Sequence, residues 1–465
     1  MKKLETSQQV SELFDRLYPL CRSILGEGYR ESLKILEEYI PLEEEYFPSD
    51  EKVLNWVVPQ EWVLIEACIK DEEGNTVIDF KDNNLHVVNY SDKIDEIMDL
   101  EVLKQHIYTS EADDDAIPYT ISYYKKRWGF CMSKKQLAQL EEGKYHAYVD
   151  SEYIDGNLVI GETVLPGESD KEILLTSYLC HPSMANNELS GPLVMAMLYQ
   201  KIQKWKTRKF TYRFVVNPET IGSIAYLSRH GEALKQSVYA GLVFTCLGGT
   251  EQLRYKTSRG EHSTIDKLVE EINEENPDTF RIEVFSPTSG SDERQYCSPG
   301  FNLPVGQMAR KVYAEYKEYH TSLDTKELMG IDNIIESCDK LEEFLLRHEA
   351  EAETLMGKAN TPSQLDKGEG KYFYRNRYPY GEVKLGDYNL YPSLNTSGVK
   401  KEDSESLINE PWFIRSVMML LNYSDGDCSL EYCAKRLELE IDVLQKVADI
   451  LVDRGLLDGP LEKNN

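Results

Sequence analysis

The sequence predicts an α/β fold in which helices flank a mainly parallel sheet. Three observations lead to this prediction. Apolar runs typical of buried strands alternate with helical patterns between residues 172 and 308, and this alternation favours parallel strands. A β-rich stretch at 56–120 precedes that region, and short helical patterns close the chain. Its 465 residues suffice for two or three domains.

The first 40 residues predict two helices. Val10, Leu13 and Leu17 recur at helical spacing, and the stretch 22–26 marks the break before the second helix. Two hairpins are expected further on. One covers 61–80 and turns at Glu-Gly-Asn, and the other covers 145–165 and turns at Asp-Gly, a pair suited to a tight turn.

Four buried-strand candidates follow, each ending in polar residues. They cover 172–181, 211–220, 241–249 and 303–308, and helices are predicted after the first two. Because ligands of such sheets bind beyond the carboxyl ends of the strands, we expect a site where these polar residues fall.

The domain organisation follows from these elements. An α/β domain is expected from residues 1–55 and 121–360, and 56–120 form a small inserted β domain. Residues 361–410, rich in Gly, Tyr and Pro, predict an irregular linker or arm. The last stretch, 411–465, has the outline of a winged helix.

Composition limits the partners. The chain has 52 basic and 81 acidic residues and a net charge of −29, which argues against nucleic acid and anionic membranes. The winged-helix stretch has ten acidic and six basic side chains, so we expect it to contact protein, over the active-site mouth or between two subunits of a homo-oligomer. No apolar run approaches the ~20 residues of a membrane span. Nine scattered cysteines and a polar N-terminus predict a reduced, cytoplasmic setting.

The loop after the first buried strand has the residue types of a metal site. His181 ends that strand and Glu188 lies seven residues on, an imidazole and a carboxylate of the kind that bind zinc. Ser190 is expected to cap the following helix and Pro192 to occupy its first turn. The alternative is an ordinary capped loop with a solvated histidine.

Three later strand ends add further candidates. Glu219 follows a strand and could act as a general base. Asp292 and Glu293 precede another strand. His320 is followed closely by two residues that could orient its ring, namely Thr321 and Asp324.

The motif order HP…SG-helix, PETIGS, SDE and YHTSLDT resembles the zinc aminopeptidase superfamily. More closely, the chain resembles an aminopeptidase-like bacterial family with an inserted β domain and a C-terminal winged helix. That family also carries YYKKRWGFC, CHPS and SDERQYCSPG, and the resemblance covers essentially the whole chain. It implies a zinc-peptidase core similar to phosphorylases and hydrolases, and its members are often encoded near genes for surface polysaccharide synthesis.

The resemblance also implies differences from a two-zinc enzyme. A bridging Asp falls on Asn186, the second residue of a Glu-Glu pair on Thr220, and a strand-end Asp near Thr245. We therefore expect one zinc ion, held by three residues, with a water in the fourth position. These three are His181, Glu188 and His320. The alternative is a site for two ions, in which Asp292 or Glu293 supplies a further ligand. Asp292, Glu293 and Asn187 are thus the residues that could bind metal or substrate.

The sequence thus predicts a zinc-dependent amide hydrolase, aminopeptidase-like, with Glu219 as the general base. Its substrate would be a peptide or a small amide. Two alternatives remain open at this point. One is a deacylase acting on an amino sugar or a modified amino acid in surface-polysaccharide synthesis. The other is a non-catalytic binding or scaffold protein on a degenerate peptidase core.

Overall fold

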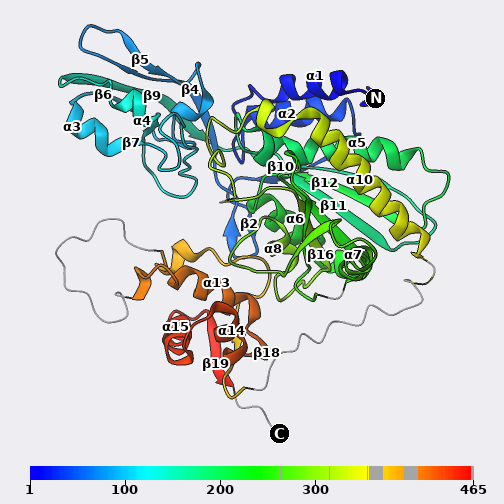
Figure 1. The fold of residues 1–465 in the computed structure, drawn as a ribbon. Helices are drawn as coiled ribbons and strands as arrows, with labels where there is room; N and C mark the ends of the chain where they lie inside the picture. Colours follow the sequence, from blue (N-terminus) through cyan, green and yellow to red (C-terminus); the bar gives the residue numbers. More distant parts are fainter. Residues whose placement is uncertain (262, 314, 353, 355–369, 392–406, 462–465) are drawn as a thin grey trace.

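The computed structural model describes most of the chain, namely residues 1–261, 263–313, 315–352, 354, 370–391 and 407–461. Figure 1 shows an α/β domain, a β domain inserted to one side of it, and a C-terminal domain below. No helix in the described ranges is long and apolar enough to cross a membrane.

An eight-stranded sheet forms the centre of the α/β domain. From edge to edge its strands are β1 (Glu43–Pro48), β10 (Asn157–Leu165), β12 (Thr211–Asn217), β11 (Glu172–Tyr178), β13 (Val238–Phe244), β16 (Val305–Ala309), β14 (Leu253–Lys256) and β15 (Phe280–Glu283). The middle strands β12, β11, β13 and β16 are parallel. Every residue of β11 and β13 is buried. The predicted parallel core is confirmed, and antiparallel pairs extend it on both sides.

The register of β11 and β12 fixes the place of the site. The two strands end level, since Tyr178 lies opposite Asn217. In the sheet β12 lies on one side of β11, and the next strand of the chain, β13, lies on the other side of β11. Ligands of α/β sheets bind at such a switch point, and His181 and Glu219 follow these two strands directly.

Helices cover both faces of this sheet (Figure 1). They are α1 (Ser7–Leu17), α2 (Glu27–Glu37), α5 (Ser190–Gln203), α6 (Ile221–Ser237), α7 (Thr264–Glu275), α8 (Glu293–Tyr296), α9 (Lys326–Met329) and α10 (Ile331–Ala350). The two predicted N-terminal helices are confirmed: α1 buries Val10, Leu13 and Leu17 and packs with α5 and α10.

The start of α5 differs from the prediction. Ser190 does not cap it, because a single π-helical turn, Ala185–Leu189, runs directly into the helix. The Ser190 hydroxyl donates instead to the carbonyl of Asn186 at 2.5 Å, and accepts from the Leu247 amide at 2.9 Å. π-Helical turns inside helices are rare and occur often at functional sites.

The inserted domain is a four-stranded sheet in the order β5 (Thr76–Asp79), β4 (Glu61–Lys70), β9 (Lys144–Ile154) and β6 (Ile94–Asp99). The β4–β5 hairpin is confirmed. The hairpin expected over 145–165 is wrong, because β9 pairs with β4 and β6 whereas β10 pairs with β1 and β12. At the bend between the two sheets Gly156 donates to the Ser49 hydroxyl at 3.0 Å. The inserted sheet thus extends to residue 154, beyond the expected boundary at 120.

Shorter elements complete these two domains. They are β2 (Lys52–Val53), β3 (Trp56–Val57), β7 (Ile107–Tyr108), β8 (Phe130–Cys131), α3 (Leu100–Leu103), α4 (Lys134–Leu137), η1 (Asn84–His86), η2 (Lys104–His106) and the π-helical turn η3 (Ala185–Leu189).

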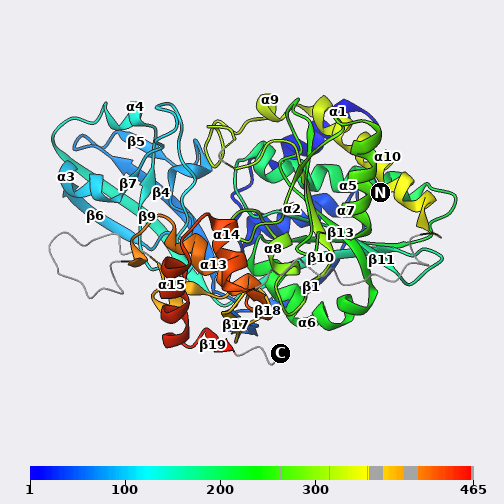
Figure 2. The same cartoon turned by 60° about the horizontal axis from the view of Figure 1, so that its bottom comes forward.

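The C-terminal domain has the predicted winged-helix outline. It contains β17 (Phe373–Asn376), η4 (Leu385–Tyr388), α13 (Phe413–Tyr423), β18 (Asp425–Ser429), α14 (Leu430–Leu437), α15 (Ile441–Asp453) and β19 (Leu457–Leu461). Because β17 pairs with both β18 and β19, the stretch expected as a linker supplies a strand of this domain. Much of the expected linker, 361–369 and 392–406, lies outside the described residues. Figure 2 shows α13 and α14 near α8.

Candidate active site

His181 and Glu188 face each other in the loop between β11 and α5. Both are buried, and His181 Nδ1 lies 2.6 Å from Glu188 Oε2. The buried Arg22 donates from Nε to the carbonyl of His181 at 2.9 Å. This contact fixes the loop backbone, while the carboxylate fixes the ring and leaves His181 Nε2 directed elsewhere.

Asp324 holds the π-helical turn and not the His320 ring. Its carboxylate accepts from the amides of Asn186 at 2.7 Å and Asn187 at 2.8 Å. The Thr321 hydroxyl donates to the carbonyl of Glu318 at 2.7 Å. Neither Asp324 nor Thr321 therefore orients the His320 ring as expected. The Asp324 carboxylate is used instead as the acceptor that the buried amides of the Glu188 turn need.

His320 nevertheless lies close to His181. The centroids of the two rings are 5.2 Å apart, and Tyr319 stacks on His320 at 3.9 Å. The backbone of His320 has a φ of 54°, a left-handed conformation that costs energy for a residue with a Cβ. Among the described residues, the buried His320 Nε2 has no hydrogen-bond partner, and neither has Glu188 Oε1.

Glu219 stands on a tight turn between β12 and α6. Thr220 has φ 65° and ψ −72°, and the Ile221 amide donates to the carbonyl of Glu219 at 2.8 Å. These values define a γ-turn of the rare, strained kind. Glu219 Oε2 lies 3.6 Å from His181 Nε2, and Glu219 Oε1 accepts from the Ser291 hydroxyl at 2.5 Å. The strained turn thus places a carboxylate opposite the histidine.

Asp292 and Glu293 do not face the histidines. Asp292 accepts from Asn217 Nδ2, from the Thr220 amide and from the Ser223 hydroxyl at 2.7–2.9 Å. Glu293 pairs with Lys256 at 2.8 Å and accepts from Gln307 at 3.0 Å. Both carboxylates are fully buried, so their hydrogen bonds serve the turn and the strand behind the site. Asn187 lies in the π-helical turn, where its amide nitrogen Nδ2 is buried without a partner among the described residues.

Burial and neighbouring charges shift the pKa values at the site. Burial disfavours a charged His181, but the Cys180 thiol and the Glu188 carboxylate together raise its pKa well above the usual value. Burial and the adjacent His181 lower the pKa of His320 well below 6.5. Burial also raises the pKa of Glu219, and it raises that of Asp292 to about 7. A raised carboxylate pKa suits proton transfer near neutral pH.

The donor set fits a zinc ion. Ligand atoms of Cys180, His181 and Glu188 lie within 4.8 Å of one another, and imidazole, carboxylate and thiolate are the groups that zinc prefers. The unpartnered Glu188 Oε1 and His320 Nε2 are buried acceptors that a cation would satisfy. Cys180 was not among the candidates from sequence, although its position beside His181 could have suggested it.

A cavity of about 570 Å³ opens onto these groups. Its lining comprises Ile24, Trp56, Tyr119, Ile121, Ser122, Tyr123, Tyr124, Lys125, Arg127, Cys180, His181, Glu219, Thr220, Ile221, His320 and Tyr391. Cavities of this size and apolar character are typical of small-molecule sites. The tyrosine-rich wall was missed in the sequence, because aromatic residues in a β domain are usually core.

Two families match the chain. A family described as a domain of unknown function (DUF4910) matches residues 11–351, and a winged helix-turn-helix family matches residues 372–459. A Clostridium acetobutylicum protein is 36% identical over 97% of this chain and 96% of its own length. Its name refers to polysaccharide biosynthesis and to an aminopeptidase-like domain.

Solved structures agree with the fold described above. A C. acetobutylicum crystal structure, whose name refers to a peptidase, has 34% identity and a TM-score of 0.71 over 98% of this chain and 96% of its own. A zinc aminopeptidase from Bacillus subtilis has 10% identity and a TM-score of 0.53 over 75% of this chain and 96% of its own. At that identity the similarity establishes the aminopeptidase-like fold alone.

Proposed function

Because the chain belongs to the DUF4910 family and has a relative of nearly its full length with an aminopeptidase-like domain, we propose that it is a zinc-dependent amide hydrolase built on an aminopeptidase-like fold. One observation carries this proposal. A partly exposed carboxylate, Glu219, faces His181 in a cavity that also receives His320. A base beside buried metal-binding groups is the arrangement that hydrolysis of an amide needs.

Three residues would hold the ion, namely His181, Glu188 and His320, with the Cys180 thiol beside them. When bound, zinc would polarise a substrate carbonyl and lower the pKa of a nearby water. Asp324 fixes the turn that carries Glu188. One ion is expected, since the carboxylates of Asp292 and Glu293 are engaged elsewhere.

Glu219 moves the protons. Its carboxylate takes a proton from the attacking water and then gives it to the amide nitrogen as the C–N bond breaks. Ser291 holds Glu219 Oε1, so Glu219 Oε2, which faces His181, is the oxygen that accepts the proton. Burial, which raises the Glu219 pKa, makes the carboxylate a stronger base than a solvated one. The substrate is a peptide or a small amide, and the acidic chain with its scattered cysteines supports a cytoplasmic setting.

A chromogenic amide screen tests the proposal. Zinc-loaded protein should hydrolyse at least one compound in a panel of aminoacyl p-nitroanilides, N-acetyl amino acids and N-acetylated amino sugars. Glu219→Gln should lower turnover by about 10²–10⁴-fold, the usual contribution of a general base. Glu232→Gln, an exposed carboxylate on α6, is the matched control and should keep full activity. A panel without any hydrolysis, from protein that holds zinc, would favour the binding-protein alternative.

A further inference from the structure

One wall of the cavity comes from the inserted domain. We call residues 119–128 the tyrosine wall, since its Tyr119, Tyr123 and Tyr124 all line the cavity. Trp56 packs edge-on against Tyr124 with centroids 5.3 Å apart. Tyr391, from the C-terminal part of the chain, also lines the cavity. The inserted domain thus supplies flat aromatic faces for whatever enters.

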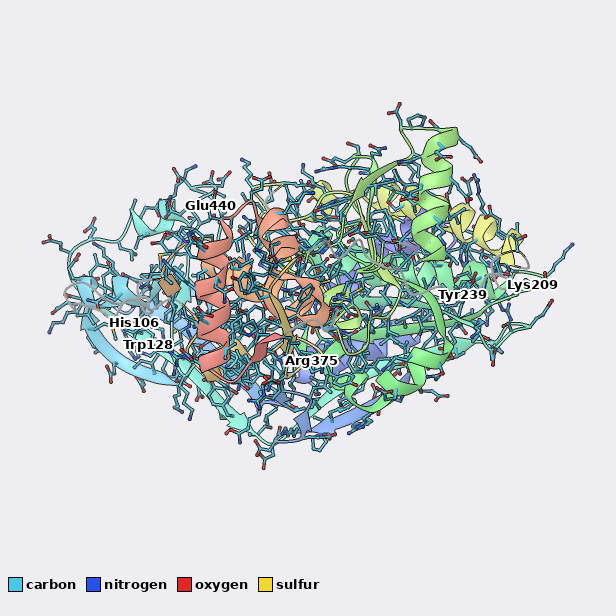
Figure 3. The ribbon with its side chains drawn as sticks, turned by 90° about the horizontal axis from the view of Figure 1, so that it is seen from below. His106, Trp128, Lys209, Tyr239, Arg375 and Glu440 are labelled. Atoms are coloured by element: carbon cyan, nitrogen blue, oxygen red, sulfur yellow. The ribbon has the colours of Figure 1, made fainter. Side chains whose placement is uncertain are left out.

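The tyrosine wall is held at both ends. At its start the Tyr119 amide donates to the carbonyl of His320 at 2.8 Å, and the Tyr119 and Tyr123 hydroxyls are 2.7 Å apart. At its end Trp128 stacks on His106 with centroids 3.7 Å apart, and Figure 3 labels these two residues close together. Such anchoring gives the cavity a preformed shape, as small-molecule sites usually have.

The wall also carries positive charge, although the whole chain has a net charge of −29. Lys125 and Arg127 line the cavity, and the adjoining cavity of about 180 Å³ adds Lys126. Lys125 is exposed, its Nζ lies 5.9 Å from the Tyr391 ring centroid, and it forms no ion pair with a carboxylate of the described chain. Its ammonium is therefore available to a ligand in the cavity.

Groups that would bind a positively charged substrate amine are scarce in the same cavity. Of the residues that line it, Glu219 alone is a carboxylate. Asp292 and Glu293 are buried and saturated by hydrogen bonds. Glu188 Oε2 is directed to His181. A substrate with a free ammonium would meet Lys125 and Arg127 without a second carboxylate to balance them, which is unfavourable.

We propose that the substrate amide carries an anionic group, a carboxylate or a phosphate, which binds Lys125 while a ring of the substrate lies against Trp56 and Tyr124. This inference rests on the proposed function for the location of the reacting amide, and it selects an acylated, anionic substrate over a free N-terminus. Arg127, whose guanidinium donates to the Ile121 carbonyl and lies over the Tyr108 ring, adds to the positive potential and shapes the wall.

Binding measurements test the anion site without turnover. Zinc-loaded Glu219→Gln protein is titrated by calorimetry with matched pairs of probes. N-acetyl-L-tyrosine is compared with its neutral amide, and N-acetylglucosamine 6-phosphate with N-acetylglucosamine. We expect one anion of the two pairs to bind about fivefold more tightly than its neutral partner, the effect of a partly exposed charge pair of about 1 kcal/mol. A preference within the tyrosine pair would identify the anionic group of the substrate as a carboxylate, and a preference within the glucosamine pair would identify it as a phosphate.

Variants assign the preference to Lys125. In a Lys125→Met background the anion and its neutral partner should bind equally, and Lys125→Arg should restore the preference. Lys144→Met, an exposed lysine of the same domain outside the cavity, should keep it. Three results would overturn the proposal. They are an anion preference that persists in Lys125→Met, equal binding of both members of each probe pair, and tighter binding of the cation L-tyrosinamide than of the anion. An intact anion preference in protein that hydrolyses nothing would refute the proposed function and leave the anion site standing.

Discussion

Asp292 Oδ1 accepts a hydrogen bond of 2.7 Å from the backbone amide of Thr220. The same carboxylate accepts from Asn217 and Ser223, so a single buried group holds the end of β12, the γ-turn and the first turn of α6. Glu219 stands on that turn. The position of Glu219 opposite His181 therefore depends on Asp292, which lies 72 positions after Thr220 in the chain.

Asp292→Asn should lower turnover by about 10²-fold, since small misplacements of a catalytic group have effects of this size. The amide nitrogen of the new side chain would face the donor of Asn217, so the free energy of unfolding should also fall by about 1–3 kcal/mol. Steady-state kinetics and urea unfolding measure the two effects.

Two further variants separate positioning from general damage. Ser223→Ala removes one of three donors and should give the smaller loss on both measures. In a Glu219→Gln background Asp292→Asn should have little further effect on turnover, because the two changes act through the same group. A full additional loss in the double variant would show that Asp292 acts on something other than Glu219.

Zinc content gives the second prediction. Protein purified without chelator, or soaked in zinc and then desalted, should hold about one equivalent per chain by elemental analysis, as a single three-residue site implies. His181→Ala with His320→Ala should remove the ion. Circular dichroism of the double variant should still report a folded chain, because the sheet core does not depend on either ring.

Cys180 offers a matched comparison for the metal site. Its sulfur lies within 4.8 Å of the ligand atoms of His181 and Glu188, but burial raises the pKa of its thiol to about 11, which disfavours the thiolate that binds zinc. We expect Cys180→Ser to retain most of the metal. Loss of zinc in this variant, with retention in His320→Ala, would replace His320 by Cys180 in the ligand set.

Much of the fold could be predicted from the sequence, because its signals are local. The apolar runs of β11 and β13 and the helical spacing of Val10, Leu13 and Leu17 depend on neighbours within one element. The polar ends of β11 and β12 likewise brought His181 and Glu219 to one edge. General rules of α/β topology then place a site there.

The contacts that could not be predicted join residues far apart in sequence. The sequence predicts that Asp324 orients His320, which is four residues away, yet Asp324 accepts a hydrogen bond from the amide of Asn187, which is 137 residues away. The Asp-Gly turn between β9 and β10 predicts that these two strands pair with each other. In the structure β9 pairs with strands of the inserted sheet, whereas β10 pairs with strands of the central sheet. The long-range partners, not the local patterns, decide such cases.

Stability should depend on pH through the buried His348. Burial lowers its pKa to about 4, and its ring stacks on Phe210 and contacts the Thr264 hydroxyl at 3.0 Å. Below pH ~6.5 the unfolded chain takes up a proton that the folded chain does not, so stability falls as pH is lowered through that window. Between pH 7 and pH 5 this group should cost about 2 kcal/mol.

Unfolding in urea at pH 7 and at pH 5 measures the effect of His348. His348→Gln should remove this part of the pH dependence. Thr264→Val keeps the imidazole and should keep the pH dependence, although it lowers stability at both pH values. The same slope in wild type and in His348→Gln would assign the acid sensitivity to other groups.

One basic side chain of the C-terminal domain, that of Arg436, contacts the α/β domain. Arg436 on α14 donates to Glu261 at 3.2 Å and to the carbonyl of Phe285 at 2.6 Å, both in the α/β domain. In return the buried Arg259 of that domain pairs with Asp425 at 2.9 Å. These contacts bind the winged helix to the rest of the chain.

A winged helix nevertheless suggests DNA, and the charges predict the opposite. A helix that follows phosphates needs a basic face, whereas α15 has three acidic residues, Asp442, Asp449 and Asp453, and one lysine, Lys446. Its N-cap is the acidic Glu440 and its C-cap is Arg454. We expect no binding of mixed-sequence duplex DNA at micromolar protein and low salt, as measured by fluorescence anisotropy. The low-salt condition favours binding, because the attraction to phosphates weakens steeply with salt, so a flat titration there is decisive. Tight binding that disappears as salt is raised would instead show a DNA-binding surface on this domain.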